Sequence, residues 1–215
     1  MNPGAHTANS RIRRGLETPG RHGVATRSLP ACLPLAFFLV CHRLGVLYTR
    51  IVLRVRITLQ QVHVFERAHP QDQGPRYSAY RLRRRLRCST SRVGVGQQAG
   101  SNCSPLGLHR VAEKIGAGWP VGTAFRGRRP IGFAWKEFPS ATITSRILWL
   151  DGLEPGFNRG PKVDSHARHI YIHGTADEPG LGRPASHGCI HLAATDLLPL
   201  FDQLPSGSLV WITAT

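Results

Sequence analysis

From Leu53 onward, the 215-residue chain is dominated by short segments in which apolar and polar residues alternate. Such alternation is typical of β-strands with one buried face, because successive side chains of a strand point to opposite sides. Glycine and proline residues separate these segments. Alternation, or a compact apolar run of strand length, occurs at 53–59, 62–65, 146–150, 169–173 and 208–213. The pattern therefore predicts a mostly β domain built from many short strands.

Two further segments fit more than one kind of structure. RLRRRLRC (81–88) is either an exposed edge strand or a disordered basic run, and LHRVAEKI (108–115) is either a strand or a short helix.

The segment ATDLLPLFDQL (194–204) predicts one helix, with Asp196 as its N-cap and Pro199 in the first turn, where a missing N–H is tolerated. Turn-rich breaks lie at 69–75, 94–102 and 151–161.

The first 52 residues differ from the rest. Residues 2–30 show neither a helical nor a strand period. The apolar run ACLPLAFFLVC (31–41) is shorter than the roughly 20 residues of a membrane span. It has the length of a signal-peptide core, but Pro34 interrupts it and no A-x-A site follows. We interpret 1–52 as a basic leader of uncertain order, either a degraded export signal or the product of a wrong start codon or frameshift, and 53–215 as the folded domain.

Positive charge is concentrated in the N-terminal part of the chain. The net charge is +16, of which residues 1–92 carry +14, from 17 Arg, no Lys and three acidic residues. Such charge could serve to bind nucleic acid or an anionic surface of the cell envelope. An arginine excess without lysine is also what a GC-rich gene produces. Aromatic residues interleaved with basic ones would mark a nucleic-acid binder, and only Tyr77 and Tyr80 lie near, so we expect no nucleic-acid partner.

The candidate chemistry lies in HGTADEPGLGRPASHGCIHL, which begins at His173. Cys189 stands between His187 and His191, and the five cysteines are odd in number and lack C-x-x-C spacing, so one thiol is left unpaired. A thiolate is a strong nucleophile, and His173 at a strand end is a candidate general base. Gly188 lets the backbone turn so that its amide and that of Cys189 can point at a developing oxyanion.

The cluster also fits two other roles. His187, Cys189 and His191 would share one face of a strand, so with His173 they could hold zinc in a metal-stabilised binding module. Gly188 argues against a regular strand, and no carboxylate is evident to orient the imidazoles. A buried inert thiol is the ordinary role of a single cysteine, but the surrounding histidines and glycines disfavour it. We therefore predict a nucleophile without metal or cofactor. Surface or core-filling roles are expected for His109, His166 and His169.

The same residues resemble a known signature. IYIHGT (170–175) followed by GRPASHGCIHL (182–192) is similar to the motif of L,D-transpeptidase catalytic domains of the YkuD fold, His-Gly-Thr and then Ser-His-Gly-Cys-Ile/Val-Arg. The resemblance covers 90–215 and, more loosely, 53–89. Further similar segments are SPLGLHRV (104–111), TSRILWLDGLEPGFN (144–158) and PSGSLVWI (205–212).

This resemblance implies a mostly β, sandwich-like catalytic domain over 53–215, with one short helix after the cysteine. It also implies peptidoglycan cross-linking in the bacterial cell envelope. Cys189 would attack a stem tetrapeptide, release D-alanine and pass the acyl group to an amine of another stem. Hydrolysis by the same residues, as in an L,D-carboxypeptidase, is an alternative. Neither the acceptor nor the oligomeric state follows from the sequence.

The resemblance also assigns roles to individual residues. It makes Cys189 the nucleophile, His173 the base and the Gly174 carbonyl the group that orients the imidazole. The amides of Gly188 and Cys189 would form the oxyanion hole. Ser186 and His187 are expected to orient the site. His191 stands where the family usually has an arginine, and it is the candidate substrate contact.

Overall fold

The computed structural model describes Met1, residues 32–68 and residues 79–215. Most of the predicted leader and the turn-rich break at 69–75 lie outside the described residues. Two helices are present, α1 (Leu35–Arg43) and α2 (Ala194–Gln203). The strands are β1 (Ile51–Arg56), β2 (Gln61–Arg67), β3 (Tyr80–Ser89), β4 (Gly107–Ile115), β5 (Thr123–Arg126), β6 (Arg129–Phe133), β7 (Thr144–Gly152), β8 (Tyr171–Gly174), β9 (Ile190–Leu192) and β10 (Leu209–Thr213).

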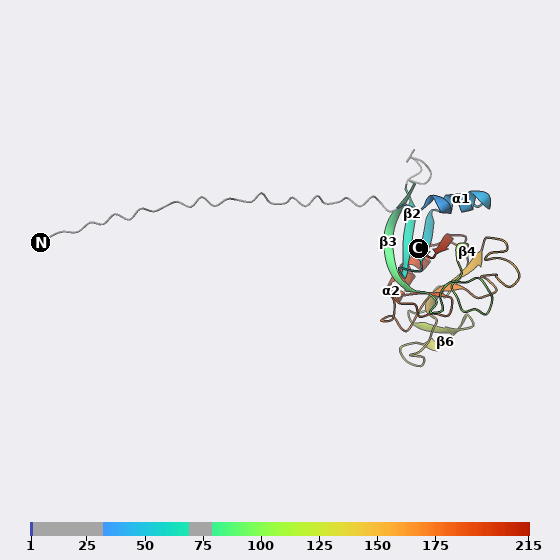
Figure 1. Ribbon diagram of the computed structural model, residues 1–215. Helices are drawn as coiled ribbons and strands as arrows, with labels where there is room; N and C mark the ends of the chain where they lie inside the picture. The colour runs from blue at the N-terminus through green and yellow to red at the C-terminus, as the bar shows by residue number, and fades with distance from the viewer. Residues whose placement is uncertain (2–31, 69–78) are drawn as a thin grey trace.

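The strands form one sheet that returns on itself. Its order is β4-β10-β1-β2-β3-β9-β8-β7-β5-β6, and β4 also pairs with β7. This last pairing closes eight strands into a barrel-like wall, while β5 and β6 extend from it as a hairpin (Figure 1). Most neighbours are antiparallel, but β1–β10 and β8–β9 run parallel. The predicted mostly β class is confirmed, and both ambiguous segments, 81–88 and 108–115, are strands.

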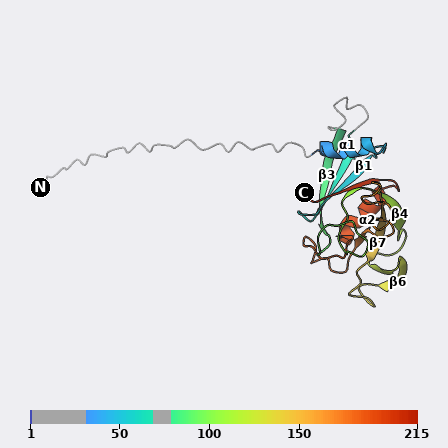
Figure 2. The same ribbon diagram turned by 45° about the vertical axis from the view of Figure 1, so that its right-hand side comes forward.

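The main core lies on the side of the sheet that faces α2. Alternate residues of the eight barrel strands point toward this side, as the sequence pattern predicted, and pack with Leu197, Leu200 and Phe201 of α2. Figure 2 shows where α2 lies relative to the strands. The strand residues include Leu53, Val62, Leu86, Val111, Leu148, Ile172, Ile190 and Val210. The side chains between them point to the outer face, which two other elements cover.

The start of α2 differs from the prediction. The helix begins at Ala194 because the carboxylate of Glu178 accepts the Ala194 N–H at 2.7 Å, so a residue distant in sequence satisfies the N-terminus instead of Asp196. Pro199 is consequently the sixth helical residue rather than part of the first turn. Burial of Leu197, Leu200 and Phe201 provides the tertiary packing that offsets the lost backbone hydrogen bond.

Helix α1 covers one part of the outer face and was not predicted. The apolar run interpreted as a signal-peptide core forms this helix, and Phe37, Phe38 and Cys41 are buried in it. They pack with Tyr80, Trp211 and other outward side chains of the sheet. The described part of the segment that was interpreted as a leader of uncertain order is thus packed on the sheet, and β1 begins at Ile51. The boundary at 52/53 stays a prediction.

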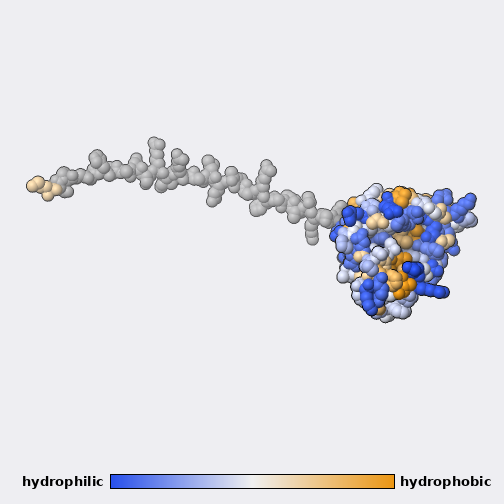
Figure 3. Space-filling model, turned by 90° about the horizontal axis from the view of Figure 1, so that it is seen from below, coloured by the Kyte–Doolittle hydropathy of each residue, from blue (hydrophilic) through white to orange (hydrophobic). Residues whose placement is uncertain are grey.

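The hairpin β5–β6 lies at the opposite end of the domain from α1 (Figure 1). Phe125 of β5 packs on Ile147, Trp149 and Tyr171, with Cys189 at the edge of this cluster. The hairpin thus adjoins the part of the outer face that carries the candidate nucleophile. Hydrophilic residues cover much of the face seen in Figure 3, where hydrophobic residues gather in small patches.

Candidate active site

Two rows of side chains cross three neighbouring strands on the outer face. Ile147, His173 and His191 are register partners on β7, β8 and β9. Trp149 pairs with Tyr171, and Cys189 continues this second row immediately before β9. Because β8 and β9 are parallel, paired residues share a face of the sheet. The sequence-predicted base and nucleophile therefore lie on adjacent strands, on the same face and in adjacent rows.

The Cys189 thiol is held by the main chain of the segment that leads into β8. Its Sγ accepts the Tyr171 N–H at 3.4 Å and donates to the His169 carbonyl at 3.4 Å. Both contacts are with backbone groups rather than with an imidazole. Burial raises the pKa of the thiol to about 11, against smaller opposing effects of the Tyr171 N–H and the Arg168 charge. In this resting structure Cys189 is thus a neutral thiol at physiological pH.

The buried imidazole of His173 has a defined tautomer. Its Nδ1 lies 2.8 Å from the Gly174 carbonyl, which can only accept a hydrogen bond, so Nδ1 carries the proton and Nε2 is the free base. Burial, followed by the neighbouring His191, lowers the pKa of His173 to about 3. A side chain at Gly174 would collide with Thr144, since its Cβ would lie 2.6 Å from the Thr144 carbonyl oxygen. Glycine is therefore needed where this carbonyl meets the ring.

His191 packs against His173, with 4.7 Å between ring centroids. It is 8% exposed, and burial lowers its pKa to about 4, so it is uncharged at neutral pH. His191 is thus a neutral ring in contact with the base. Substrate contact by His191 stays a prediction, whereas its packing on His173 is observed.

The residues just before Cys189 form a tight hydrogen-bonded loop. Ser186 Oγ accepts the Gly188 N–H at 3.1 Å and donates to the Cys189 carbonyl at 2.6 Å. Gly188 has φ +123°, a conformation that favours glycine. Its amide is already engaged, which differs from the expected free oxyanion donor and leaves the Cys189 amide as the remaining candidate. His187 is exposed and does not contact the thiol.

Comparison with known protein families assigns the chain to one of them. The family model of the L,D-transpeptidase catalytic domain (YkuD) matches residues 64–212, which is more than half of the sequence. The chain belongs to this family. No match was found among curated proteins.

Solved structures similar to this chain were also found. Bd1075 of Bdellovibrio bacteriovorus has a TM-score of 0.51 at 15% identity, covering 78% of this chain and 49% of that one. An L,D-transpeptidase from Mycobacterium smegmatis has 0.44 at 13%, covering 77% and 59%. L,D-transpeptidase 3 from Mycobacterium tuberculosis has 0.44 at 15%, covering 76% and 61%. The chain thus spans about half to three fifths of these proteins.

The sequence did not single out Ser104, which supports residues 186–188 of this L,D-transpeptidase domain. These residues lead into Cys189 and are called the cysteine loop. Its buried hydroxyl donates to the Gly188 carbonyl at 2.9 Å and accepts the Ser91 N–H at 3.0 Å. One side chain thereby fixes the peptide that precedes the nucleophile. Only a three-dimensional contact reveals this role, because Ser104 and Gly188 are 84 residues apart.

We expect Ser104→Ala to destabilise the domain by about 1–3 kcal/mol, because a buried carbonyl and a buried N–H lose their partner. Urea unfolding measures this change. Ser206→Ala, at an exposed serine, is the control and should change stability by less than about 0.5 kcal/mol. Equal stability of the two variants would show that the cysteine loop does not depend on Ser104.

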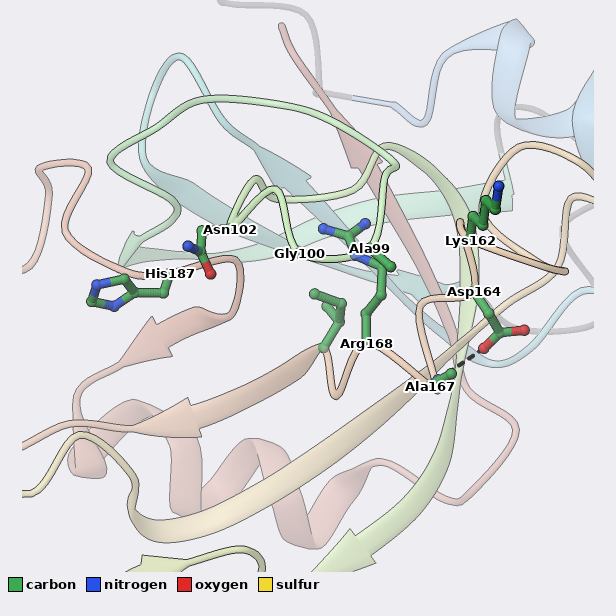
Figure 4. A pocket seen from close by; sticks show the side chains of 9 residues that line it. Ala99, Gly100, Asn102, Lys162, Asp164, Ala167, Arg168 and His187 are labelled. Atoms are coloured by element: carbon green, nitrogen blue, oxygen red, sulfur yellow. Dashed lines mark hydrogen bonds between the residues drawn. The ribbon is translucent and has the colours of Figure 1, made fainter.

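Arg168 joins the loops beside the thiol. Its guanidinium donates to the carbonyls of Gly96, Gln97 and Cys103. Between these loops lies a cavity of about 340 Å³, and Arg168 and His187 are among its lining residues (Figure 4). The positive charge of Arg168 acts on the thiol and opposes the effect of burial on its pKa. A guanidinium with three carbonyl partners primarily fixes the loop geometry around the nucleophile.

The zinc alternative is not supported by the arrangement. Among residues 32–68 and 79–215, no three His, Cys, Asp or Glu side chains come together as potential metal ligands. His187 is exposed, whereas His173 and His191 are buried. In the same described part of the chain, no helix is long and apolar enough to span a membrane.

Proposed function

We propose that this protein is a peptidoglycan L,D-transpeptidase of the bacterial cell envelope that uses Cys189 as nucleophile and His173 as base. The observation that carries this proposal is the placement of the two residues in adjacent rows on one face of the parallel pair β8–β9. Membership of the catalytic-domain family supports the reaction class. The orienting hydrogen bond from His173 Nδ1 to the Gly174 carbonyl supports the direction of proton transfer.

In the first step, Cys189 Sγ attacks the carbonyl carbon of an L-centre in a stem tetrapeptide. The thiol proton passes to His173 Nε2 as the thiol turns from its contact with the His169 carbonyl. The carbonyl oxygen becomes an oxyanion, for which the Cys189 amide is the proposed donor. The C–N bond then breaks, His173 returns the proton to the leaving nitrogen, and D-alanine departs from a thioester.

In the second step, an amine of another stem peptide attacks the thioester carbonyl. His173 Nε2 accepts a proton from the attacking nitrogen, and the C–S bond breaks as the new amide forms. Transfer of that proton to the sulfur restores the neutral thiol and imidazole. The protein therefore ends the cycle in the state that the structure shows, and no external oxidant, reductant or metal enters the balance.

Incubation with a carbapenem followed by mass spectrometry of the digested protein tests this proposal. A β-lactam carbonyl is a substitute for the acyl donor, and opening of its ring leaves the acyl group on the sulfur. We expect one covalent adduct, on the peptide that contains Cys189. An adduct confined to another cysteine would contradict the proposed nucleophile, and an unmodified protein would contradict the proposed chemistry.

The pH dependence of acylation provides a second test. Burial lowers the pKa of His173 to about 3 and raises that of Cys189 to about 11, so the reactive pair of thiol and free imidazole persists between these values. We expect acylation rates by a carbapenem to be nearly level from about pH 5 to 9, and to fall only as His173 is protonated at lower pH. A bell-shaped profile with limbs near the ordinary pKa values of histidine and cysteine would contradict a buried neutral pair.

A further inference from the structure

The turn between β5 and β6 places an arginine in an unusual backbone conformation. Arg126 pairs with Arg129, so Gly127 and Arg128 alone form the turn. Their φ angles are +52° and +70°. A two-residue hairpin with both residues in the left-handed region is the type I′ turn, which favours glycine and asparagine. The backbone disfavours arginine at the second position of this turn, so a role of the Arg128 side chain would account for its presence there.

The Arg128 side chain is fixed on the sheet face that carries the nucleophile. Its guanidinium carbon lies 4.3 Å from the ring centroid of Trp149, and its Nη1 donates to Tyr171 Oη at 3.1 Å. His166 stacks on the same indole, with 3.9 Å between centroids and 3° between planes. Two groups this close to one ring must occupy opposite faces of it. Trp149 therefore holds Arg128 on one side and is itself held by His166 on the other.

Arg128 has no acidic partner in the part of the chain that the structure describes, where its polar contact is the Tyr171 hydroxyl. A guanidinium has five N–H donors, and this single contact leaves several of them for another acceptor. The neighbouring Arg126 and Arg129 are exposed. Arg128 is thus an oriented, partly buried cation whose hydrogen-bonding capacity is largely unused.

This cation and the thiol both contact one residue, Tyr171. Tyr171 contacts both groups, since its hydroxyl accepts from Arg128 and its backbone N–H donates to Cys189 Sγ. The Tyr171 side chain thus leads from the backbone next to the thiol to the guanidinium, and a peptide held at Cys189 would extend along it. His191 is uncharged, and the guanidinium of Arg168 is engaged with three carbonyls.

We propose that Arg128 binds a carboxylate of the acyl donor and so positions an anionic peptide for attack by Cys189. This rests on the proposed function, in which the donor ends in a carboxylate one residue beyond the reacting carbonyl. The planar guanidinium matches a carboxylate with two parallel N–H···O bonds. The substrate class of the site is accordingly a peptide acid rather than a neutral amide or ester.

Alkylation of Cys189 tests the charge recognition without requiring acyl transfer. Iodoacetate and iodoacetamide differ mainly in the carboxylate, and digestion with mass spectrometry gives the rate at Cys189 alone. We expect Arg128→Asn to slow iodoacetate by about fivefold or more and to change iodoacetamide by less than about twofold. Asparagine suits the turn, so the hairpin is kept, and Arg128→Lys should restore part of the iodoacetate rate. Arg126→Asn and Arg129→Asn are matched controls and should alter neither rate.

An equal change for both reagents in Arg128→Asn would show that the residue only holds the hairpin, and no change for either would show that its charge does not reach the site. Each overturns the proposal. With a tetrapeptide donor, we expect Arg128→Asn to raise KM about tenfold and leave kcat within about threefold. A wild-type protein that shows the iodoacetate preference but transfers no acyl group would refute the proposed function and leave the carboxylate site standing.

Discussion

Replacement of Cys189 by serine is expected to lower acyl transfer by about a thousandfold or more. A serine hydroxyl is a much weaker nucleophile than a thiol, and His173, which the substitution keeps, does not compensate for this difference. The fold should remain, since serine is smaller than cysteine and can keep the contacts to Tyr171 and His169. The release of D-alanine from a tetrapeptide measures the effect.

Cys103→Ser is the matched control for this variant. Cys103 is half-buried in a loop beside the site, and its carbonyl, which the substitution keeps, accepts a hydrogen bond from Arg168. We expect this variant to retain at least about half of the wild-type rate. Loss of transfer in Cys103→Ser together with full transfer in Cys189→Ser would reverse the assignment of the nucleophile.

Phe37→Ala is expected to reduce the free energy of unfolding by about 3–5 kcal/mol. Phe37 is 0% exposed and contacts the rings of Phe38, Tyr48, Tyr80 and Trp211. Removal of its ring leaves a cavity between α1 and the outer face of the sheet. Urea unfolding followed by tryptophan fluorescence measures the loss, because Trp211 reports on this contact.

Leu39→Ala is the matched control, because it truncates an apolar side chain of α1 that is not buried against the sheet. Leu39 is in the same helix but 60% exposed, so we expect its truncation to change stability by less than about 1 kcal/mol. If both variants unfold like the wild type, α1 does not stabilise the domain, and the leader interpretation of the whole segment before Leu53 would be restored.

The strands were predictable because a half-buried strand imposes a period of two on its sequence. RLRRRLRC shows why some remained ambiguous: five of its eight residues are arginines, and only Leu82, Leu86 and Cys88 are apolar. Helix α1 was missed for a different reason. Its residues are apolar nearly all round, so Phe37 and Leu39 look alike in the sequence, although one is buried and the other exposed.

The candidate site was predictable only where its residues are close in sequence. Cys189, Gly188 and Ser186 occur together, and His173 and Gly174 are adjacent, so one motif contains the nucleophile, the base and its orienting carbonyl. Ser104 and Arg128 come from other loops, and neither has a local pattern that separates it from an ordinary serine or arginine. The charge state of His191 was also beyond the sequence, because its lowered pKa follows from burial.

The position of β10 in the sheet has a consequence for how the chain acquires its structure. This strand, the last described strand in chain order, lies between β1 and β4 and pairs with both. Until residues 209–213 leave the ribosome, those two strands expose unpaired edges, and the barrel-like wall remains open. Contacts between the ends of a chain form slowly because a long loop must close first. The nascent domain therefore stays incompletely folded until β10 has been synthesised, which keeps it accessible to chaperones and to any export machinery that accepts only unfolded chains.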